Sequence, residues 1–128
     1  MSKYVLDASA LLALFNMEQG EDIVAKLLPL SVMSTVNIAE VISELDKKLD
    51  IKPEEGKKLI MNAIDKIVPL DLDQAVAIGN LRKYTSHLGL SLGDRACLAL
   101  GITTGYPIYT ADRAWGKLEL DCKIILIR

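Results

Sequence analysis

The sequence predicts an α/β fold, a three-layer α/β/α sandwich around a central, mostly parallel five-stranded sheet. Short apolar runs rich in β-branched residues alternate with longer segments of helical period along the whole chain. Such alternation produces βαβ units, with a parallel sheet and helices on both of its faces. No repeat or Pro/Gly-rich linker divides the sequence, so we expect a single domain over residues 1–128.

The expected elements follow one another in a regular order. Strands are predicted at residues 3–6, 31–34, 67–70, 107–110 and 122–127, and helices at 8–16, 19–28, 37–50, 54–66, 72–86, 92–103 and, as a short one, near 113–118. The helix over 54–66 follows Pro53 and carries Glu54 and Glu55 in its first turn, as helix N-termini prefer.

Composition excludes several classes of protein. Hydrophobic residues make up 51% of the chain and charged residues 25%, which predicts a packed core rather than disorder. No stretch approaches the ~20 consecutive apolar residues of a membrane span, and we expect a cytoplasmic protein. Cys97 and Cys122 are too few for a disulfide framework, and His87 is the only histidine, so a catalytic triad or a His-rich zinc site would lack its parts.

The charge balance restricts the kind of chemistry further. A formal net charge of −2 argues against nonspecific nucleic-acid binding through a broad basic face. It leaves open an acidic site that reaches phosphate through a divalent metal. If this chain carries out chemistry, carboxylates must do it.

Four acids stand near expected helix entrances. Asp7 directly follows a strand in VLDASALLALF, and Asp112 follows another in YTADRAW. Glu40 in STVNIAEV and Asp94 in LSLGDRACLALG lie in the first turns of their helices. Taken singly, each acid could be a helix cap, and Asn37–x–x–Glu40 and Ser91–x–x–Asp94 resemble capping boxes.

Taken together, the four acids indicate a site. In parallel α/β sheets, ligands bind beyond the carboxyl ends of the strands, where the strand order reverses, and the first and fourth strands are natural neighbours there. Four carboxylates around one crevice repel each other, and hard oxygen-preferring cations such as Mg²⁺ or Mn²⁺ would offset that repulsion. Such an ion activates water and stabilises charge in phosphodiester hydrolysis.

The same four segments, in this order, resemble the PIN-domain nucleases, and more closely the VapC-type toxins of toxin–antitoxin pairs. The resemblance runs from residue 4 to the closing strand KIILIR. It implies a Mg²⁺- or Mn²⁺-dependent endoribonuclease with Asp7, Glu40, Asp94 and Asp112 as the catalytic and metal-binding set. Ser9 and Thr110 match small hydroxyl positions that support such sites, although local hydrogen bonding explains them equally well.

The resemblance also carries expectations about metals and partners. Many PIN domains have a further acid shortly after the last motif, and it is missing here, which leaves one or two bound ions open. An RNA substrate, a cognate antitoxin that blocks the acidic site and a homodimer are implied. The apolar residues Leu59, Ile60, Ile64 and Ile67 are either part of a dimer face or part of the core.

Three residues close to the acids in the sequence each have two possible roles. Arg95 and Arg113 either contact RNA phosphate or form ion pairs that temper the acidic cluster. Trp115 either stacks on a base or packs in the core. Two other functions remain open for the chain, a housekeeping RNA-processing nuclease of the same family and a non-catalytic α/β binding module whose acids are only caps.

Overall fold

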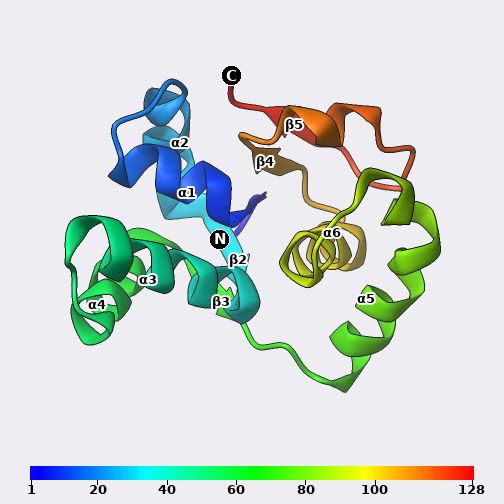
Figure 1. The fold of residues 1–128 in the computed structure, drawn as a ribbon, viewed down its shortest axis with the longest axis horizontal. Coiled ribbons are helices and arrows are strands. Elements are labelled where there is room, and N and C mark those ends of the chain that lie inside the picture. The colour runs from blue at the N-terminus through cyan, green and yellow to red at the C-terminus, as the bar shows by residue number, and fades with distance from the viewer.

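The computed structural model describes residues 1–128 as a five-stranded, all-parallel sheet between two layers of helices, as predicted (Figure 1). The elements in chain order are β1 (Tyr4–Leu6), α1 (Ala8–Phe15), α2 (Glu21–Leu27), η1 (Leu28–Leu30), β2 (Ser31–Ser34), α3 (Thr35–Leu49), α4 (Pro53–Ala63), β3 (Lys66–Val68), α5 (Leu72–Thr85), η2 (Ser86–Leu88), α6 (Leu92–Thr104), β4 (Ile108–Thr110), η3 (Arg113–Lys117) and β5 (Ile124–Leu126), where η denotes a 3-10 helix.

The strand order β3-β2-β1-β4-β5 places β1 at the centre of the sheet. The chain first builds outward from β1 through β2 to β3, and then returns to add β4 and β5 on the other side. Val5 pairs with Ile108 and Leu6 with Tyr109, which confirms that the first and fourth strands are neighbours. The strand order therefore reverses between β1 and β4, and this is the point where ligands bind in such sheets.

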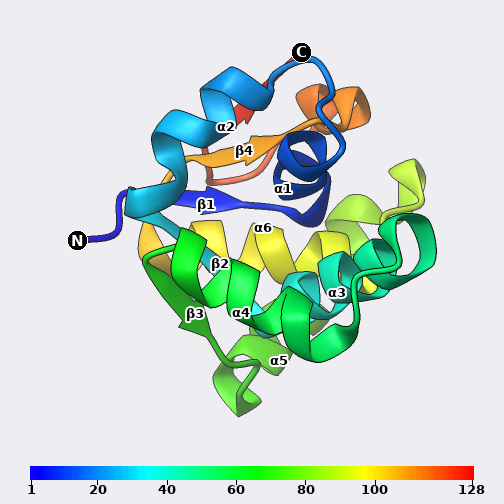
Figure 2. The ribbon, with the colours of Figure 1, turned by 90° about the vertical axis from the view of Figure 1, so that its left-hand side faces the viewer.

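Two hydrophobic cores lie on the two faces of the sheet. Leu6 and Met33 belong to the core built with α1, α2, α3 and α4, whereas their chain neighbours Val5 and Val32 belong to the core built with α5 and α6. Successive strand residues point to opposite faces of a sheet. A strand that is covered by helices on both faces therefore contributes alternate residues to the two cores, as β1 and β2 do here. Figure 2 shows α6 passing along one face of β1 while α1 and α2 lie on the other.

Several boundaries differ from the predicted ones. α2 begins at Glu21 rather than at residue 19, β3 spans Lys66–Val68 rather than 67–70, and β5 is shorter than the predicted 122–127. Two of the differences, in α3 and α4, have a clear physical cause. α3 begins at Thr35, with Ser34 as its N-cap accepting a hydrogen bond from the Val36 amide (3.2 Å), so Asn37 lies inside the helix and forms no capping box with Glu40. α4 ends at Ala63 rather than at residue 66. Ile64 is extended and buried, and the Asp65 amide donates to the Ser31 carbonyl (2.9 Å), so pairing with β2 already begins there.

Several smaller expectations are also resolved. Ile60 and Ile64 are buried in the core, so they offer no dimer face, whereas Ile67 is half-buried and Leu59 is exposed. Trp115 is fully buried, which excludes base stacking and confirms the packing role. Cys97 and Cys122 are both free thiols. No helix in the structure is long and apolar enough to cross a membrane.

Two helical glycines should respond to alanine in opposite ways. A Cβ on Gly101 of α6 would collide with the side chain of Ile108 on β4, whereas a Cβ on Gly79 of α5 would meet open space. We expect Gly101→Ala to lower the free energy of unfolding by about 1–3 kcal/mol through overpacking. Gly79→Ala should raise it by about 0.5–1 kcal/mol, since alanine favours the helix. Urea denaturation measures both, and equal effects would contradict the seating of α6 on β4.

Candidate active site

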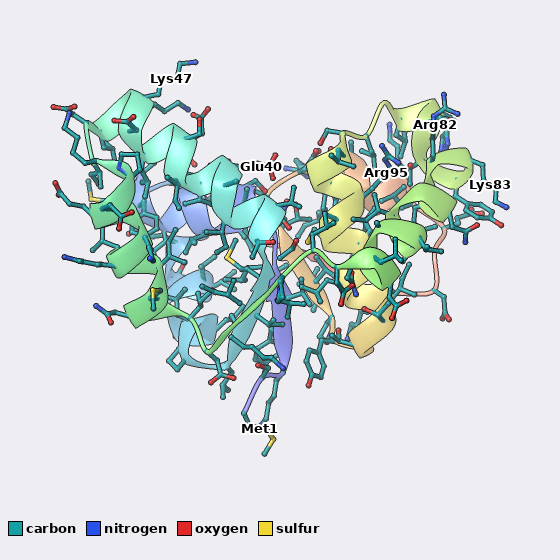
Figure 3. The ribbon with its side chains drawn as sticks, turned by 90° about the horizontal axis from the view of Figure 1, so that it is seen from below. Met1, Glu40, Lys47, Arg82, Lys83 and Arg95 are labelled. Carbon is teal, nitrogen blue, oxygen red and sulfur yellow. The ribbon has the colours of Figure 1, made fainter.

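A pocket of about 390 Å³ lies at the carboxyl edge of the sheet, next to the reversal between β1 and β4. All four predicted acids line it. The lining residues are Asp7, Ala8, Ser9, Leu12, Asn37, Glu40, Ser43, Glu44, Asp94 and Asp112. Figure 3 shows Glu40 between α3 and α6, and contacts between these two helices bring their acids to one place.

Asp7 is the most buried acid of the pocket, with 5% of its surface exposed. It caps α1 by accepting the Ala10 amide on Oδ1 (2.8 Å). Its Oδ2 accepts the Thr110 hydroxyl from the end of β4 (2.6 Å), and the Ser9 hydroxyl lies 2.8 Å from both carboxylate oxygens. Ser9 also accepts the Ala111 amide (2.9 Å). The two small hydroxyls therefore tie the carboxylate across β1 and β4.

This environment raises the pKa of Asp7 from 3.8 to about 6. Burial is the main cause, because it removes water from around the charged form. The hydrogen bonds from Thr110, Ala10 and Ser9 oppose the effect by stabilising the carboxylate, and the negative charge of Asp94 adds to it. Asp7 is therefore charged at neutral pH, and burial of this charge lowers the stability of the folded protein.

Glu40 is the sixth residue of α3, and in contrast to Asp7 its side chain is exposed to solvent. Its Oε1 accepts the side-chain amide of Asn37 (2.8 Å), which also donates to the Gly93 carbonyl of α6 (3.0 Å). The carboxylate lies directly over Gly93, where a Cβ would stand 2.6 Å from both of its oxygens. The absence of a side chain at Gly93 is therefore what lets Glu40 approach the first turn of α6.

Asp94 and Asp112 are both helix caps and pocket residues. Asp94 forms the predicted capping box with Ser91, in which its Oδ2 accepts the Ser91 amide (3.0 Å). Asp112 caps η3 by accepting the Ala114 amide on Oδ1 (3.0 Å). In each case the other carboxylate oxygen accepts no hydrogen bond from the protein. Capping therefore leaves each acid one oxygen with which to bind a ligand.

Three polar pocket residues were not predicted as part of the site. Asn37, Ser43 and Glu44 stand on the same side of α3 as Glu40, at helical spacings of three and four residues. Glu44 also pairs with Lys48 (3.2 Å) in an ordinary (i, i+4) ion pair. The spacing of four residues from Glu40 places Glu44 on the same side of the helix, but its equal spacing to Lys48 is also typical of a solvated helix surface.

The two arginines next to site acids do not pair with them. Arg95 donates from Nη1 to the Ile78 carbonyl of α5 (3.2 Å), and Arg113 is exposed. Neither forms an ion pair with any carboxylate, so the expectation that they temper the acidic cluster is wrong. Their contact with RNA stays a prediction.

The donor set of the pocket suits a hard divalent cation. Five carboxylates and the amide of Asn37 supply only oxygen ligands, and no cysteine or histidine lines the pocket. The Asn37 Oδ1 is buried without a hydrogen-bond partner. Only two other buried side-chain polar atoms of this protein lack a partner. In this structure, however, no three acids are gathered closely enough to hold one ion together.

The raised pKa of Asp7 predicts how stability changes with pH. A shift from 3.8 to about 6 corresponds to about 3 kcal/mol. Because the folded-state pKa is the higher one, this contribution is fully present below pH 3.8 and is lost as the pH rises through about 6. In EDTA, the free energy of unfolding relative to Asp7→Asn should therefore fall by about 2 kcal/mol between pH 4 and pH 7. Parallel curves for the two proteins would contradict this.

Comparison with solved structures identifies several similar chains. A chain of a toxin–antitoxin complex from Klebsiella pneumoniae has a TM-score of 0.74 at 16% identity, covering 98% of each chain. A sarcin–ricin-loop-cleaving VapC toxin of Mycobacterium tuberculosis has a TM-score of 0.73 at 14% identity, covering 94% of this chain and 98% of that one. A DNA-bound VapBC structure from Salmonella typhimurium has a TM-score of 0.70 at 16% identity over 100% of both chains.

These similarities establish the fold, and a family model establishes the relationship. No curated protein sequence matches the chain significantly. The model of the PIN domain matches residues 4–119, a range that includes every acid of the pocket. Since that match spans most of the chain, the protein belongs to the PIN domain family.

Proposed function

We propose that this protein is a metal-dependent endoribonuclease, and that it is the toxin of a type II toxin–antitoxin pair. The observation that carries the nuclease proposal is the position of Glu40. Asp7, Asp94 and Asp112 are explained as caps, and caps alone would fit a non-catalytic binding module. Glu40 caps nothing, yet it faces the same pocket.

In this proposal, Asp7, Glu40, Asp94 and Asp112 hold Mg²⁺ or Mn²⁺. When bound, such an ion lowers the pKa of water and stabilises negative charge on phosphate oxygens. Asp7 is the fixed member of the set, because three hydrogen-bond donors hold its carboxylate across β1 and β4. Asp94 and Asp112 each present the oxygen that capping leaves free.

Glu40 is the adjustable member of the set. One hydrogen bond from Asn37 holds its Oε1, and its Oε2 accepts none. A long, exposed side chain of this kind can swing toward substrate while Asn37 keeps it above α6. We assign to Oε2 the task of orienting the attacking water and accepting its proton, a step that needs a base within hydrogen-bond reach of the water.

The toxin assignment rests on the solved structures. Similar chains occur in toxin–antitoxin complexes from Klebsiella pneumoniae and in VapBC assemblies, and the match covers nearly all of this chain and of theirs. We propose a cognate antitoxin that inserts a basic side chain into the acidic pocket, where an arginine could bind carboxylates bidentately. A homodimer and a cytoplasmic location complete the proposal.

Glu40→Gln should abolish cleavage without affecting the fold. Glutamine keeps the size of the side chain and can still accept the Asn37 amide, but it removes the charge and the base. We expect cleavage of a mixed RNA pool in Mn²⁺ or Mg²⁺ to fall by roughly 100-fold or more, with the melting temperature unchanged. EDTA should abolish cleavage by the wild type.

The control is Glu55→Gln, which removes the same charge from an exposed position on α4. It should cleave as the wild type does. Full RNA cleavage by Glu40→Gln, or cleavage by the wild type in EDTA, would contradict the proposed mechanism. If the wild type cleaves nothing and Mn²⁺ does not raise its melting temperature, the acids are caps and the binding-module function is correct.

Gly93→Ala should separate activity from stability. The added methyl group would displace the Glu40 carboxylate, which is the movable end of a flexible side chain, so the cost in folding is small. We expect cleavage to fall at least tenfold while the unfolding midpoint stays within experimental error. Gly79→Ala, a helical glycine with open space around it, serves as the matched control with full activity.

A further inference from the structure

We propose that a second pocket, lined by Lys83, Tyr84, His87 and Lys117, binds the backbone of single-stranded RNA next to the cleaved bond. This inference rests on the proposed nuclease function and adds a substrate subsite to it. The pocket measures about 440 Å³ and lies where the end of α5, η2 and the end of η3 meet. It shares no lining residue with the acidic pocket.

The cations of this pocket have no carboxylate partners. None of the four ion pairs in the structure involves Lys83 or Lys117. The surrounding sequence from Gly79 to Leu118 contains five Lys and Arg residues and the only histidine, and its only acids are Asp94 and Asp112 of the other pocket. Glu119 is the one acid that lines the second pocket. A protein with a net charge of −2 thus concentrates unpaired positive charge here.

Tyr84 gives the pocket a surface on which a base can stack. Its side chain is 51% exposed at the end of α5, so the ring is accessible to a ligand. The Lys83 Nζ lies 5.2 Å from the centre of the Tyr84 ring. An exposed aromatic ring next to cations is the combination that binds single strands, where phosphates meet positive charge and bases stack.

Two short connections join this pocket to the acidic one. η3 begins beside its cap Asp112 and ends at Lys117, and its five residues at ~2 Å each span roughly 10 Å. η2 carries His87 and leads through Gly89 into the first turn of α6, which holds Asp94. Figure 3 shows Lys83 and Arg82 on the same side of the molecule as Glu40, opposite Met1. A strand with its reacting phosphate at the acids would reach the second pocket within a few nucleotides.

The chemistry favours RNA over a protein ligand here. Without metal, the five carboxylates of the acidic pocket repel phosphate, so positive charges beside that pocket would add attraction for the flanking phosphates of an RNA strand. The second pocket supplies that attraction on the correct edge of the sheet, together with a stacking ring. An acidic protein segment would pair with the lysines but would not require the exposed aromatic ring of Tyr84.

The test is the affinity of the full-length protein for a single-stranded RNA of about 12 nucleotides, a length within known site sizes, measured in EDTA as a function of salt. The double variant Lys83→Ala/Lys117→Ala should raise the Kd by about tenfold and lower the salt slope by about 1.4, or 0.7 for each lost phosphate contact. The control Lys57→Ala/Lys58→Ala removes two exposed lysines from α4 and should bind as the wild type does.

Tyr84→Ala separates stacking from charge. It should raise the Kd about fivefold or more at every salt concentration and leave the slope unchanged, whereas Tyr84→Phe should bind normally. Unchanged RNA binding by the double lysine variant would overturn the proposal, and loss of binding to an acidic peptide alone would assign the pocket to a protein partner. Equal losses in the control variant would also overturn it.

The two proposals fail in different ways. If the wild type cleaves RNA in Mn²⁺ while the double lysine variant keeps its affinity, only the subsite is wrong. If the wild type cleaves nothing but the variants lose RNA affinity as described, the nuclease proposal is wrong and the RNA-binding pocket stands. All five lysine and tyrosine positions are exposed, so melting temperatures should not change.

Discussion

The hydrogen-bonded carboxylate of Asp7 is the constraint on which the rest of the site depends. It ends the central strand, caps the first helix and receives Thr110 from the neighbouring strand, so one buried group joins the two halves of the sheet. Its charge is maintained against burial by three donors. Asp94 and Asp112 lie around it at helix starts, and Glu40 and Glu44 face it from within α3.

Most of the fold could be predicted because local pattern and tertiary structure agree. Apolar runs with β-branched residues became the five strands, and the parallel order made Asp7 and Asp112 meet at β1 and β4. The boundaries that were wrong depended on tertiary contacts. α4 stops early because Ile64 turns into the core and Asp65 joins the sheet, and neither event has a local signal in the sequence.

The polar side of α3 shows why part of the site was missed. Asn37 matched a capping pattern three residues before Glu40, but Ser34 is the cap, and the asparagine instead links Glu40 to the backbone of α6. Glu44 forms an (i, i+4) pair with Lys48, which in a sequence is indistinguishable from a solvated helix surface. A residue that serves the helix and the pocket at once shows only its helical role in the sequence.

The two edges of the sheet determine how copies of this protein can meet. β3 and β5 are edge strands of three residues each, and such edges can in principle pair with another chain. Lys66 is exposed on β3, Pro69 follows that strand, and Lys123 directly precedes β5. Short edges with lysine and proline disfavour strand-to-strand aggregation. Edge-to-edge pairing is therefore a disfavoured route of self-association, and concentrated solutions of the folded protein should resist growth into extended sheets.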